Sequence, residues 1–563
     1  MSPNLPRLLR TVAHLTPGQV TSRIVHVART QAYRRLARFP ISWLSFDAHA
    51  RGALREPLEL ETTLPVAEII DLWRQGQVSY HGIKGPRDDW KASGHTRLWQ
   101  YEKHYHVEAL ALGAAGLGNT PEAARARDDL VTLVAGWQKA CPPLAGASWE
   151  PYPIARRVLH WSLALAACPQ LGPTLAGRLA PQVRHLHRHL ETHLLGNHLL
   201  CDLFAVVAGC AVLEAPGLDA LAAVAREELC RQLRAQTLRD GGYAERTAQY
   251  HAVVLRDLLW TIALTNARGR PLALEAHATH MMQWLGAVVR SDGSFPWIND
   301  AAPDTTPAWP ALLRLAHQVG LNPEETLETP VPRPAPEGPL VLHETGWLIW
   351  RPGKSDLLFD FGLVGPPEQP GHGHADALGF ELIWEGEPLV TDTGITTYAA
   401  NETRAYERSA AAHATVSVDG EGSDEVWASF RVGGRAAPYL ARVSLDAPGA
   451  LAVQAVCKSF RGWRHERRLE FTAGKRLVVE DHLEGSFAQA ASHVPLAPGW
   501  QLTDEGGALS LVKGSQTLRF RVLAGGPARV AAGWQSAGFE HKVPRQVIHV
   551  PLVAGRASYE ICA

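Results

Sequence analysis

The spacing of apolar residues changes once along this chain, and the change limits its fold more than any other feature. From residue 66 to residue 321, apolar side chains recur at intervals of three and four, as at Leu130, Leu133 and Val134, which is the period of an amphipathic helix. Beyond residue 340 they form short alternating or β-branched runs, such as DLLFDFG and RLVVEDHLEG, separated by turn residues. A helical domain followed by an antiparallel β domain is therefore predicted.

Proline and glycine mark the boundaries within and between these regions. The breaks PYP, CPQLGP and GRP divide the helical part into repeated hairpins, which favours a bundle, a solenoid or an α/α toroid. The segment ETPVPRPAPEGP has no apolar period and is typical of an extended linker. The predicted organisation is an Arg-rich arm or capping segment at 1–65, a helical domain at 66–327, a linker at 328–339 and a β-sandwich at 340–563.

Composition excludes several classes of protein. With 46% hydrophobic and 20% charged residues the chain is a folded protein, and with 55 basic against 56 acidic residues it has no overall charge excess for nucleic acid or an anionic membrane, which leaves only local patches open. Seven cysteines without a CxxC pair predict thiols in a reducing compartment. No secretion signal or membrane span is expected, since Asp202 interrupts the longest apolar run, residues 199–213. A soluble, cytoplasmic protein is expected, while a periplasmic or secreted location reached by another route and the oligomeric state are left open.

Candidate metal ligands gather in the β region. The segment GHGHAD places His372 and His374 between glycines, which favours a loop that aims the two rings apart. Asp392 and His413 follow in the next segments. Two histidines and one carboxylate are enough to hold Zn²⁺ with a fourth position left to water.

Polar residues without a packing reason occupy two helix starts. Asn197 and His198 open a strongly apolar helix, where capping explains Asn197 but not His198. Glu245, Tyr250 and His251 follow the glycine pair of the segment DGGYAERTAQYH. The histidine-rich segment HLHRHLETH resembles a metal tract, but helical spacing scatters its rings, so it is not favoured.

Two further segments suit acidic sugars. In WEPYPIARRVLHW, Arg156 and Arg157 lie among aromatic residues, although helix packing explains them equally well. In NETRAYERSAAAH, Arg404 and Tyr406 lie in a polar stretch shortly after Tyr398.

These segments together resemble the heparinase II/III family of polysaccharide lyases. The resemblance rests on GHGHADALGFELIWEGEPLVTDTG, RAYERSAAAHATVSVDG and WASFRVGGRA, with WEPYPIARRVLHW, GNHLL and DGGYAERTAQYH upstream in the family's order, and it spans roughly residues 90 to 440. It implies an N-terminal incomplete α/α toroid and a C-terminal antiparallel β-sandwich. It also implies β-elimination of a polysaccharide or oligosaccharide containing uronic acid, which leaves an unsaturated uronide.

The resemblance also assigns residue roles. The predicted catalytic residues are Asn197, His198, Tyr250, His372 and Tyr406. The predicted substrate-binding residues are Arg157, Glu245 and Arg404. The predicted ligands of one structural zinc ion are His374, Asp392 and His413.

Some features keep other interpretations open. Ala414, Thr247 and Ala248 stand where the family often has other residues, but none is a proposed catalytic group. The missing secretion signal favours an intracellular enzyme that acts on imported oligosaccharides, or a relative attached to exopolysaccharide synthesis. The main alternative is a non-catalytic glycan-binding protein of an exopolysaccharide assembly system, although binding alone needs no acid and base. A zinc hydrolase would need a carboxylate base, for which Asp376 is the candidate.

Overall fold

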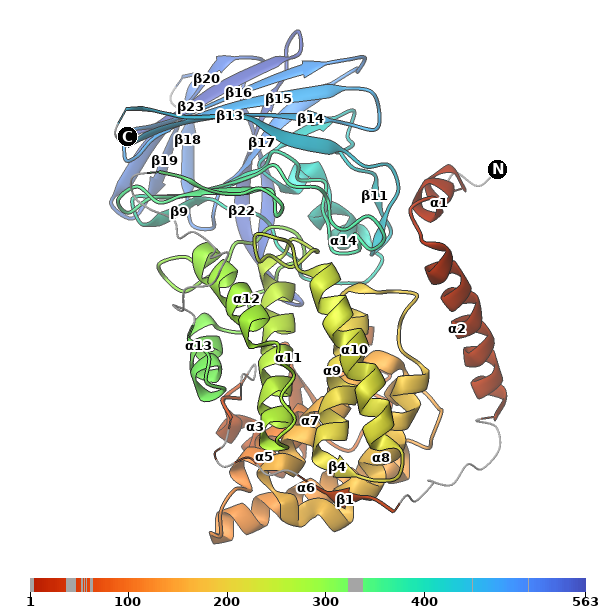
Figure 1. The fold of residues 1–563 in the computed structure, drawn as a ribbon. Helices are drawn as coiled ribbons and strands as arrows, with labels where there is room; N and C mark the ends of the chain where they lie inside the picture. Colours follow the sequence, from red (N-terminus) through yellow and green to blue (C-terminus); the bar gives the residue numbers. More distant parts are fainter. Residues whose placement is uncertain are drawn as a thin grey trace.

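The computed structural model confirms the predicted fold class, with a helical region followed by antiparallel β-sheets (Figure 1). It describes residues 5–36, 47–51, 54, 56, 58–60, 64–322, 338–447, 449–504 and 506–563. The predicted linker 328–339 lies outside the described residues except for 338 and 339. Within the described residues, no helix is both long and apolar enough to cross a membrane.

The helical domain is built from four inner helices that pack on one another in chain order. They are α5 (Val107–Ala115), α7 (Pro151–Ala167), α9 (Gly196–Val212) and α11 (Ala248–Ala267). The outer helices that cover them are α6 (Pro121–Ala140), α8 (Gly172–Arg188), α10 (Leu218–Gln236) and α12 (Glu275–Val288). Because α7, α9 and α11 are apolar on nearly all sides, they are buried around most of their circumference. The alternation of inner and outer helices is that of an incomplete α/α toroid.

Smaller elements complete the helical domain. They are α3 (Val66–Arg74), β2 (Gln77–Tyr80), β3 (Ile83–Pro86), α4 (Arg97–Lys103), α13 (Trp309–Gln318), the 3₁₀ turns Ala147–Trp149 and Pro169–Leu171, and the short pair β1 (His49–Ala50) and β4 (Leu213–Glu214).

The C-terminal domain is a sandwich of antiparallel sheets. One sheet has the order β5-β6-β7-β8-β9 and a bridge from Val390 to Leu496 links it to a second, β10-β17-β22-β21. An eight-stranded sheet, β13-β14-β15-β16-β23-β20-β19-β18, forms the opposite layer. Buried residues of both layers make one core, in which Trp350 of β6 and Phe471 of β15 meet edge to face at 6.0 Å.

The strands of the sandwich have the following bounds. The first group is β5 (Leu340–Leu342), β6 (Trp347–Trp350), β7 (Asp356–Asp360), β8 (Phe380–Trp384), β9 (Glu387–Val390), β10 (Val416–Val418), β11 (Val426–Trp427) and β12 (Arg431–Val432). The second is β13 (Ala437–Ala447), β14 (Ala450–Lys458), β15 (Arg464–Thr472), β16 (Arg476–Glu484), β17 (Ala490–Pro495) and β18 (Gln501–Asp504). The third is β19 (Ala508–Lys513), β20 (Gln516–Ala524), β21 (Arg529–Gly538), β22 (His541–Pro551) and β23 (Arg556–Cys562). Helix α14 (Glu402–Glu407) and the 3₁₀ turn Ala410–Ala412 lie between β9 and β10.

Two N-terminal helices lie along one side of both domains (Figure 1). Helix α1 (Leu5–Val12) is fastened to the sandwich, where Arg10 binds Glu425. Helix α2 (Pro17–Leu36) continues along the toroid, where Tyr33 hydrogen bonds to His189 at 2.7 Å. This part of the predicted arm therefore consists of two helices that bridge the domains, and polar contacts on its inner side hold it in place.

Candidate active site

The loops at the junction of the two domains bring together Tyr250, His372 and Tyr398. Tyr250 lies in the first turn of α11 in the toroid, while His372 and Tyr398 come from sandwich loops that follow β7 and β9. The rings of Tyr250 and His372 stack with centroids 3.9 Å apart and an angle of 8°. The hydroxyls of Tyr250 and Tyr398 are 2.5 Å apart. A reactive set is therefore assembled only where the domains meet.

Glu245 connects this set to the toroid. Its Oε2 accepts a hydrogen bond from Nδ1 of His372, while its Oε1 accepts from the backbone N–H of Asn197 at 3.1 Å and from the hydroxyl of Tyr243 at 3.1 Å. Glu245 is only 2% exposed. Because Glu245 occupies Nδ1, the nitrogen of His372 left for a substrate is Nε2.

Asn197 lies beside Glu245 with its amide available. The side chain is buried, and its Oδ1 has no hydrogen-bond partner among the described residues. Helix α9 begins at Gly196 and Asn197 makes no capping bond, so capping does not explain this residue. A buried acceptor without a partner is costly and points to a ligand group that donates to it, such as a sugar hydroxyl.

The backbone ahead of Asn197 is held in an unusual conformation. Leu195 and Gly196 have φ of 60° and 58°, and a Cβ on Gly196 would lie 2.4 Å from Oε1 of Glu245. Only glycine fits this position without strain or collision. The helix start is thus shaped to bring Asn197 against Glu245.

His198 lies at the edge of the same site and is paired with a carboxylate. Its Nδ1 lies 2.8 Å from Oε2 of Glu191, and its ring lies 4.7 Å from that of Tyr152. Burial is the largest effect and lowers the pKa of His198, but the charge and hydrogen bond of Glu191 and the charge of Glu245 together raise this pKa above its ordinary value. Burial raises the pKa of Glu191, but the charge and hydrogen bond of His198 help to lower this pKa below its ordinary value. An imidazolium on a partly exposed side chain suits a carboxylate of a sugar.

The tyrosines of the site are held as neutral phenols. Burial is the largest cause that raises the pKa of Tyr250, and the neighbouring Tyr398 adds to it. Burial likewise raises the pKa of Tyr398. A phenol with a raised pKa keeps its proton, so in this state both groups are proton donors rather than bases.

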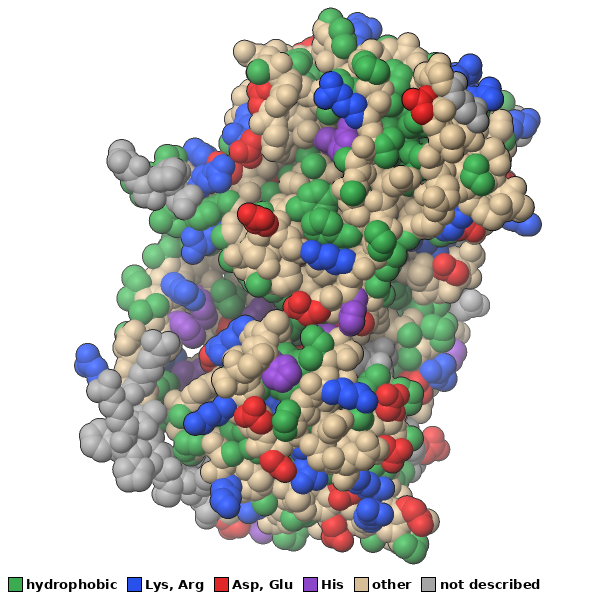
Figure 2. Space-filling model, turned by 180° about the vertical axis from the view of Figure 1, so that it is seen from behind, with side chains coloured by type: hydrophobic (Ala, Val, Ile, Leu, Met, Phe, Trp, Pro, Cys, Tyr) green, Lys and Arg blue, Asp and Glu red, His purple; other side chains and the backbone are tan. Residues whose placement is uncertain are grey.

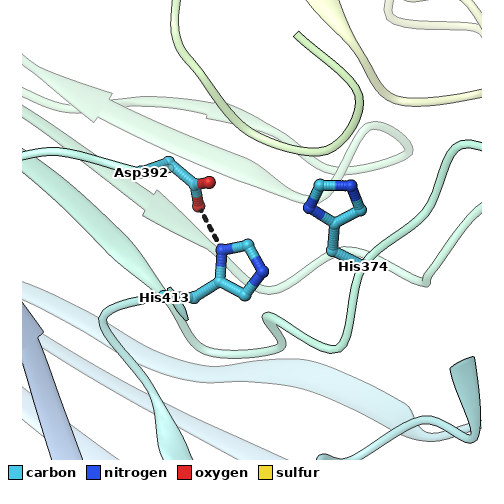
Figure 3. A group of neighbouring side chains, drawn as sticks. All are labelled: His374, Asp392 and His413. Carbon is cyan, nitrogen blue, oxygen red and sulfur yellow. Dashed lines mark hydrogen bonds and ion pairs between the residues drawn. The ribbon is translucent and has the colours of Figure 1, made fainter. Parts of the chain in front are cut away.

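Behind this set lies the predicted metal group (Figure 3). One ligand atom from each of His374, Asp392 and His413 lies within 4.8 Å of the others, and all three side chains are buried. Nδ1 of His413 is 2.8 Å from Oδ2 of Asp392, and Nε2 of His374 is 2.8 Å from Oδ1 of Asp300.

These side chains fit a metal ion. Nδ1 of His374 and Nε2 of His413 are buried and have no hydrogen-bond partner among the described residues, so each ring has a nitrogen to give. Burial lowers the pKa of His374 to about 4, which leaves the ring neutral as a ligand requires. Asp300 supplies the outer carboxylate that commonly orients a metal-bound histidine. An N,N,O donor set of this kind suits zinc.

The glycines of the segment GHGHAD let one short loop supply a histidine to the reactive set and another to the metal group. His372 turns to Tyr250, whereas His374 turns to the metal group, so the two rings do point apart. A Cβ on Gly373 would collide with the carbonyl oxygen of Val364 at 1.8 Å. The loop therefore needs glycine between the two histidines because the backbone of another segment lies against it.

Tyr406 lies outside the reactive set. Its ring packs on Trp534 with centroids 4.4 Å apart. The hydroxyl that meets Tyr250 belongs to Tyr398 instead. The structure thus places Tyr398, and not Tyr406, beside Tyr250, and a catalytic role of Tyr406 stays a prediction.

The two predicted substrate-binding arginines bind groups of the protein itself. Arg157 is fully buried in the toroid and binds Gln182 and two backbone carbonyls. Arg404 is also fully buried, and its two Nη atoms bind Asp300. Both arginines are 0% exposed, and their contact with substrate stays a prediction.

The carboxylate of Glu245 is engaged by groups of the protein itself. The sequence predicts that it binds substrate, but both of its oxygens are occupied by protein donors. It therefore positions His372 and Asn197.

Sequence reasoning missed three residues of this site. Asp300 lies outside the polar motifs, and Glu191 lies in the segment HLHRHLETH, which is not favoured as a metal tract; both join the site only through tertiary contacts. Tyr398 stands close to the polar stretch of Arg404 and Tyr406, but no motif distinguishes it from Tyr406. Only the path of the loop after β9 shows which tyrosine reaches Tyr250.

The chain matches one family model, and its fold resembles several solved structures. Residues 334–561 match the family model Heparinase II/III-like, C-terminal, which confirms the resemblance for the sandwich. A crystal structure of heparinase III superposes with a TM-score of 0.71 at 14% identity and covers 97% of this chain and 91% of that one. A heparan sulfate lyase HepC mutant from Pedobacter heparinus gives a TM-score of 0.60 at 13% identity, with 97% and 88% covered. A comparison with curated proteins gives no match. At such identities the similarity shows the fold.

Proposed function

We propose that this protein is a polysaccharide lyase that cleaves a glycan containing uronic acid by β-elimination. The observation that carries the proposal is the joint placement of Tyr250, His372, Tyr398 and Asn197 at the domain junction. A glycan-binding protein needs aromatic and charged contacts but has no use for a histidine backed by a buried carboxylate.

Each group has a place in the reaction. Nε2 of His372 removes the proton from C5, and the electrons of that bond form the C4–C5 double bond while the C4–O bond breaks. The hydroxyl of Tyr250 gives its proton to the departing O4, consistent with the raised pKa that keeps the phenol protonated until then. The amide of Asn197 and the imidazolium of His198 donate to the uronate carboxylate, where negative charge develops as C5 loses its proton.

The metal has a structural part in this proposal. His374, Asp392 and His413 would hold one zinc ion, which when bound ties together the loops that precede Tyr398 and follow His372. No step of the elimination passes through it.

The first substrates to test follow from the similar structures, whose titles name heparinase III and heparan sulfate lyase. Purified protein is incubated with heparan sulfate, hyaluronan, chondroitin, alginate and glucuronan while the ultraviolet absorbance of the unsaturated uronide is recorded. We expect one acidic polymer to give product, and a His372→Ala variant of unchanged melting temperature to give none. If every polymer, and oligosaccharides made from them, binds without product, the glycan-binding alternative replaces the lyase.

A further inference from the structure

The N-terminal helices expose the apolar side that a helix of a globular protein normally buries. Of the 17 large apolar side chains exposed among the described residues, seven lie in α1 and α2. They are Leu8, Leu9, Val12, Val20, Ile24, Val25 and Val27. Seen from behind, green side chains follow the outer edge of the molecule where these helices run (Figure 2). Such a concentration on a short segment marks an interaction surface.

The polar side of each helix faces the protein. On α2, the inward residues recur with helical spacing and each has a partner in the body of the protein. They are Gln19 to the carbonyl of Glu368, Ser22 to Thr192, His26 stacked on His193 at 4.3 Å, Arg29 to the carbonyl of Arg188, and Tyr33 to His189. On α1, Arg7 and Arg10 bind Glu421 and Glu425 of the sandwich.

Helical geometry places the exposed apolar residues away from these anchors. Val20, Ile24 and Val27 are spaced by four and three residues and so share one face of α2. Leu8, Leu9 and Val12 share the outer face of α1 in the same way. We call these six residues the outer stripe. In a helix packed on a core the apolar face points inward, whereas in α1 and α2 the apolar face points outward.

Charge decides which occupant fits the outer stripe. The sequence of residues 5–36 contains six arginines and no aspartate or glutamate. The exposed Arg23 and Arg35 lie beside the stripe on α2. A second copy of the chain would bring the same positive charges together without an acid in either arm to pair with them, whereas anionic lipid headgroups would complement them.

We propose that α1 and α2 dock on the surface of an anionic lipid bilayer, with the outer stripe among the acyl chains near the headgroups and Arg23 and Arg35 on the headgroups. Apolar residues on one side with arginines beside them and no acidic residue are the features of an interfacial helix. The inner contacts keep the two domains attached to the docked arm. This surface is independent of the catalytic site, so the proposal stands apart from the lyase assignment.

The test measures partitioning of the full chain onto sedimented vesicles. Vesicles of phosphatidylcholine are compared with vesicles of equal parts phosphatidylcholine and phosphatidylglycerol, each at low and high salt. We expect binding to the anionic vesicles that weakens at high salt and that falls at least about tenfold in the double variant Leu9→Ser with Ile24→Ser. The matched control is Val224→Ser with Val553→Ser, since those residues are 59% and 57% exposed against 61% and 66% for Leu9 and Ile24.

The outcomes separate the occupants. The control pair should bind like the parent, and all variants should keep the parent melting temperature because the changed residues are exposed. Absence of binding to anionic vesicles, or equal loss in the control pair, overturns the proposal. A dimer that dissociates only in the Leu9→Ser, Ile24→Ser variant, without vesicle binding, assigns the outer stripe to a second copy instead.

Discussion

Direct contacts restrict the side-chain orientations of Tyr250, His372 and Tyr398. The stacked rings of Tyr250 and His372 fix the phenol over the imidazole, and the hydroxyl of Tyr398 fixes the direction of the Tyr250 hydroxyl. Orientation of this kind matters to proton transfer because the donor must lie within hydrogen-bonding reach of the atom that it protonates. In the proposed mechanism the two tyrosines have unequal roles, with Tyr250 as proton donor and Tyr398 as the group that orients it.

The first prediction compares three tyrosine variants. Tyr250→Phe removes the proposed donor and should lower kcat by about 10²–10⁴-fold. Tyr398→Phe removes one hydrogen bond and should lower kcat by roughly tenfold. Tyr406→Phe, the matched control on α14, should leave kcat within about threefold. Steady-state kinetics on the substrate found in the polymer screen gives the three values, and near-parent turnover by Tyr250→Phe would remove this residue from the mechanism.

The second prediction concerns the charge of His198. Because its folded pKa lies above the ordinary value, the imidazolium is fully present at lower pH and is lost as pH rises through the raised pKa. Glu191→Gln removes the charge that raises it, so the alkaline limb of kcat/KM should move to lower pH. The exposed Glu122→Gln serves as control and should keep the parent profile. An unmoved alkaline limb in Glu191→Gln contradicts the assignment.

For single residues, the sequence indicated which side chains belong to the candidate site better than it indicated which side chains they contact. Asn197, Tyr250 and His372 do converge, because motifs at element ends meet where the domains join. The choice between Tyr398 and Tyr406 depended on how the loop after β9 folds, and a short stretch of sequence does not determine that. The internal partners of Arg157 and Arg404 were not predictable for a related reason, since arginine is used both for substrate and for holding carbonyls and carboxylates inside a fold.

The start of α9 is the element on which the site most depends. The sequence predicts a cap at Asn197, but the helix begins one residue earlier, after a residue with positive φ. This geometry could not be predicted, because the backbone N–H of Asn197 is held by Glu245, which lies 48 residues further along the chain. A residue that looks like a cap is thereby freed to face the ligand.

The third prediction tests that turn. Gly196→Ala places a Cβ against Glu245 in a conformation that itself costs an ordinary residue about 1–2 kcal/mol. Gly217→Ala at the start of α10 is the control, since its φ is 77° and its Cβ would find nothing nearer than 4.0 Å. Both should lower the melting temperature, but only Gly196→Ala should also lower kcat. Equal kcat in the two variants would show that the turn is not needed for catalysis.

The fourth prediction concerns the loops joined by the metal group. Metal analysis of purified protein should find about one zinc per chain, and chelation should lower the melting temperature more than it lowers the rate of the protein that stays folded. His374→Ala should contain little metal, whereas the control His482→Ala on β16 should contain as much as the parent. Protein without stoichiometric metal, with His374→Ala as stable as the parent, would refute the site.

Across the whole molecule, the order of helical then β structure was predictable because it depends on the period of apolar residues alone. The bridging position of α1 and α2 was not, since their contacts are made by scattered polar side chains on the inner side. The predicted catalytic residues come from both halves of the chain, which implies only in outline that the two domains meet. The details of this meeting rest on residues such as Asp240, whose carboxylate accepts the backbone N–H groups of Glu344 and Thr345.

The fifth prediction follows from that meeting. A chain that ends at residue 327 keeps Tyr250, Asn197 and Glu245 but loses His372 and Tyr398, so it should yield no unsaturated product. Circular dichroism would check that its helices form. Product from the shortened chain would mean that the toroid alone carries the chemistry.

Asp300 connects the helical part to the sandwich. It belongs to the helical part, yet its carboxylate binds both Arg404 and His374 of the sandwich, and its backbone N–H donates to the carbonyl of His372 at 3.1 Å. During synthesis the helical part leaves the ribosome first and can fold first. The carboxylate that orients His374 therefore stays without its partners until the sandwich arrives. His374 and His372 therefore reach their observed positions against Asp300 only when the sandwich docks on the helical part.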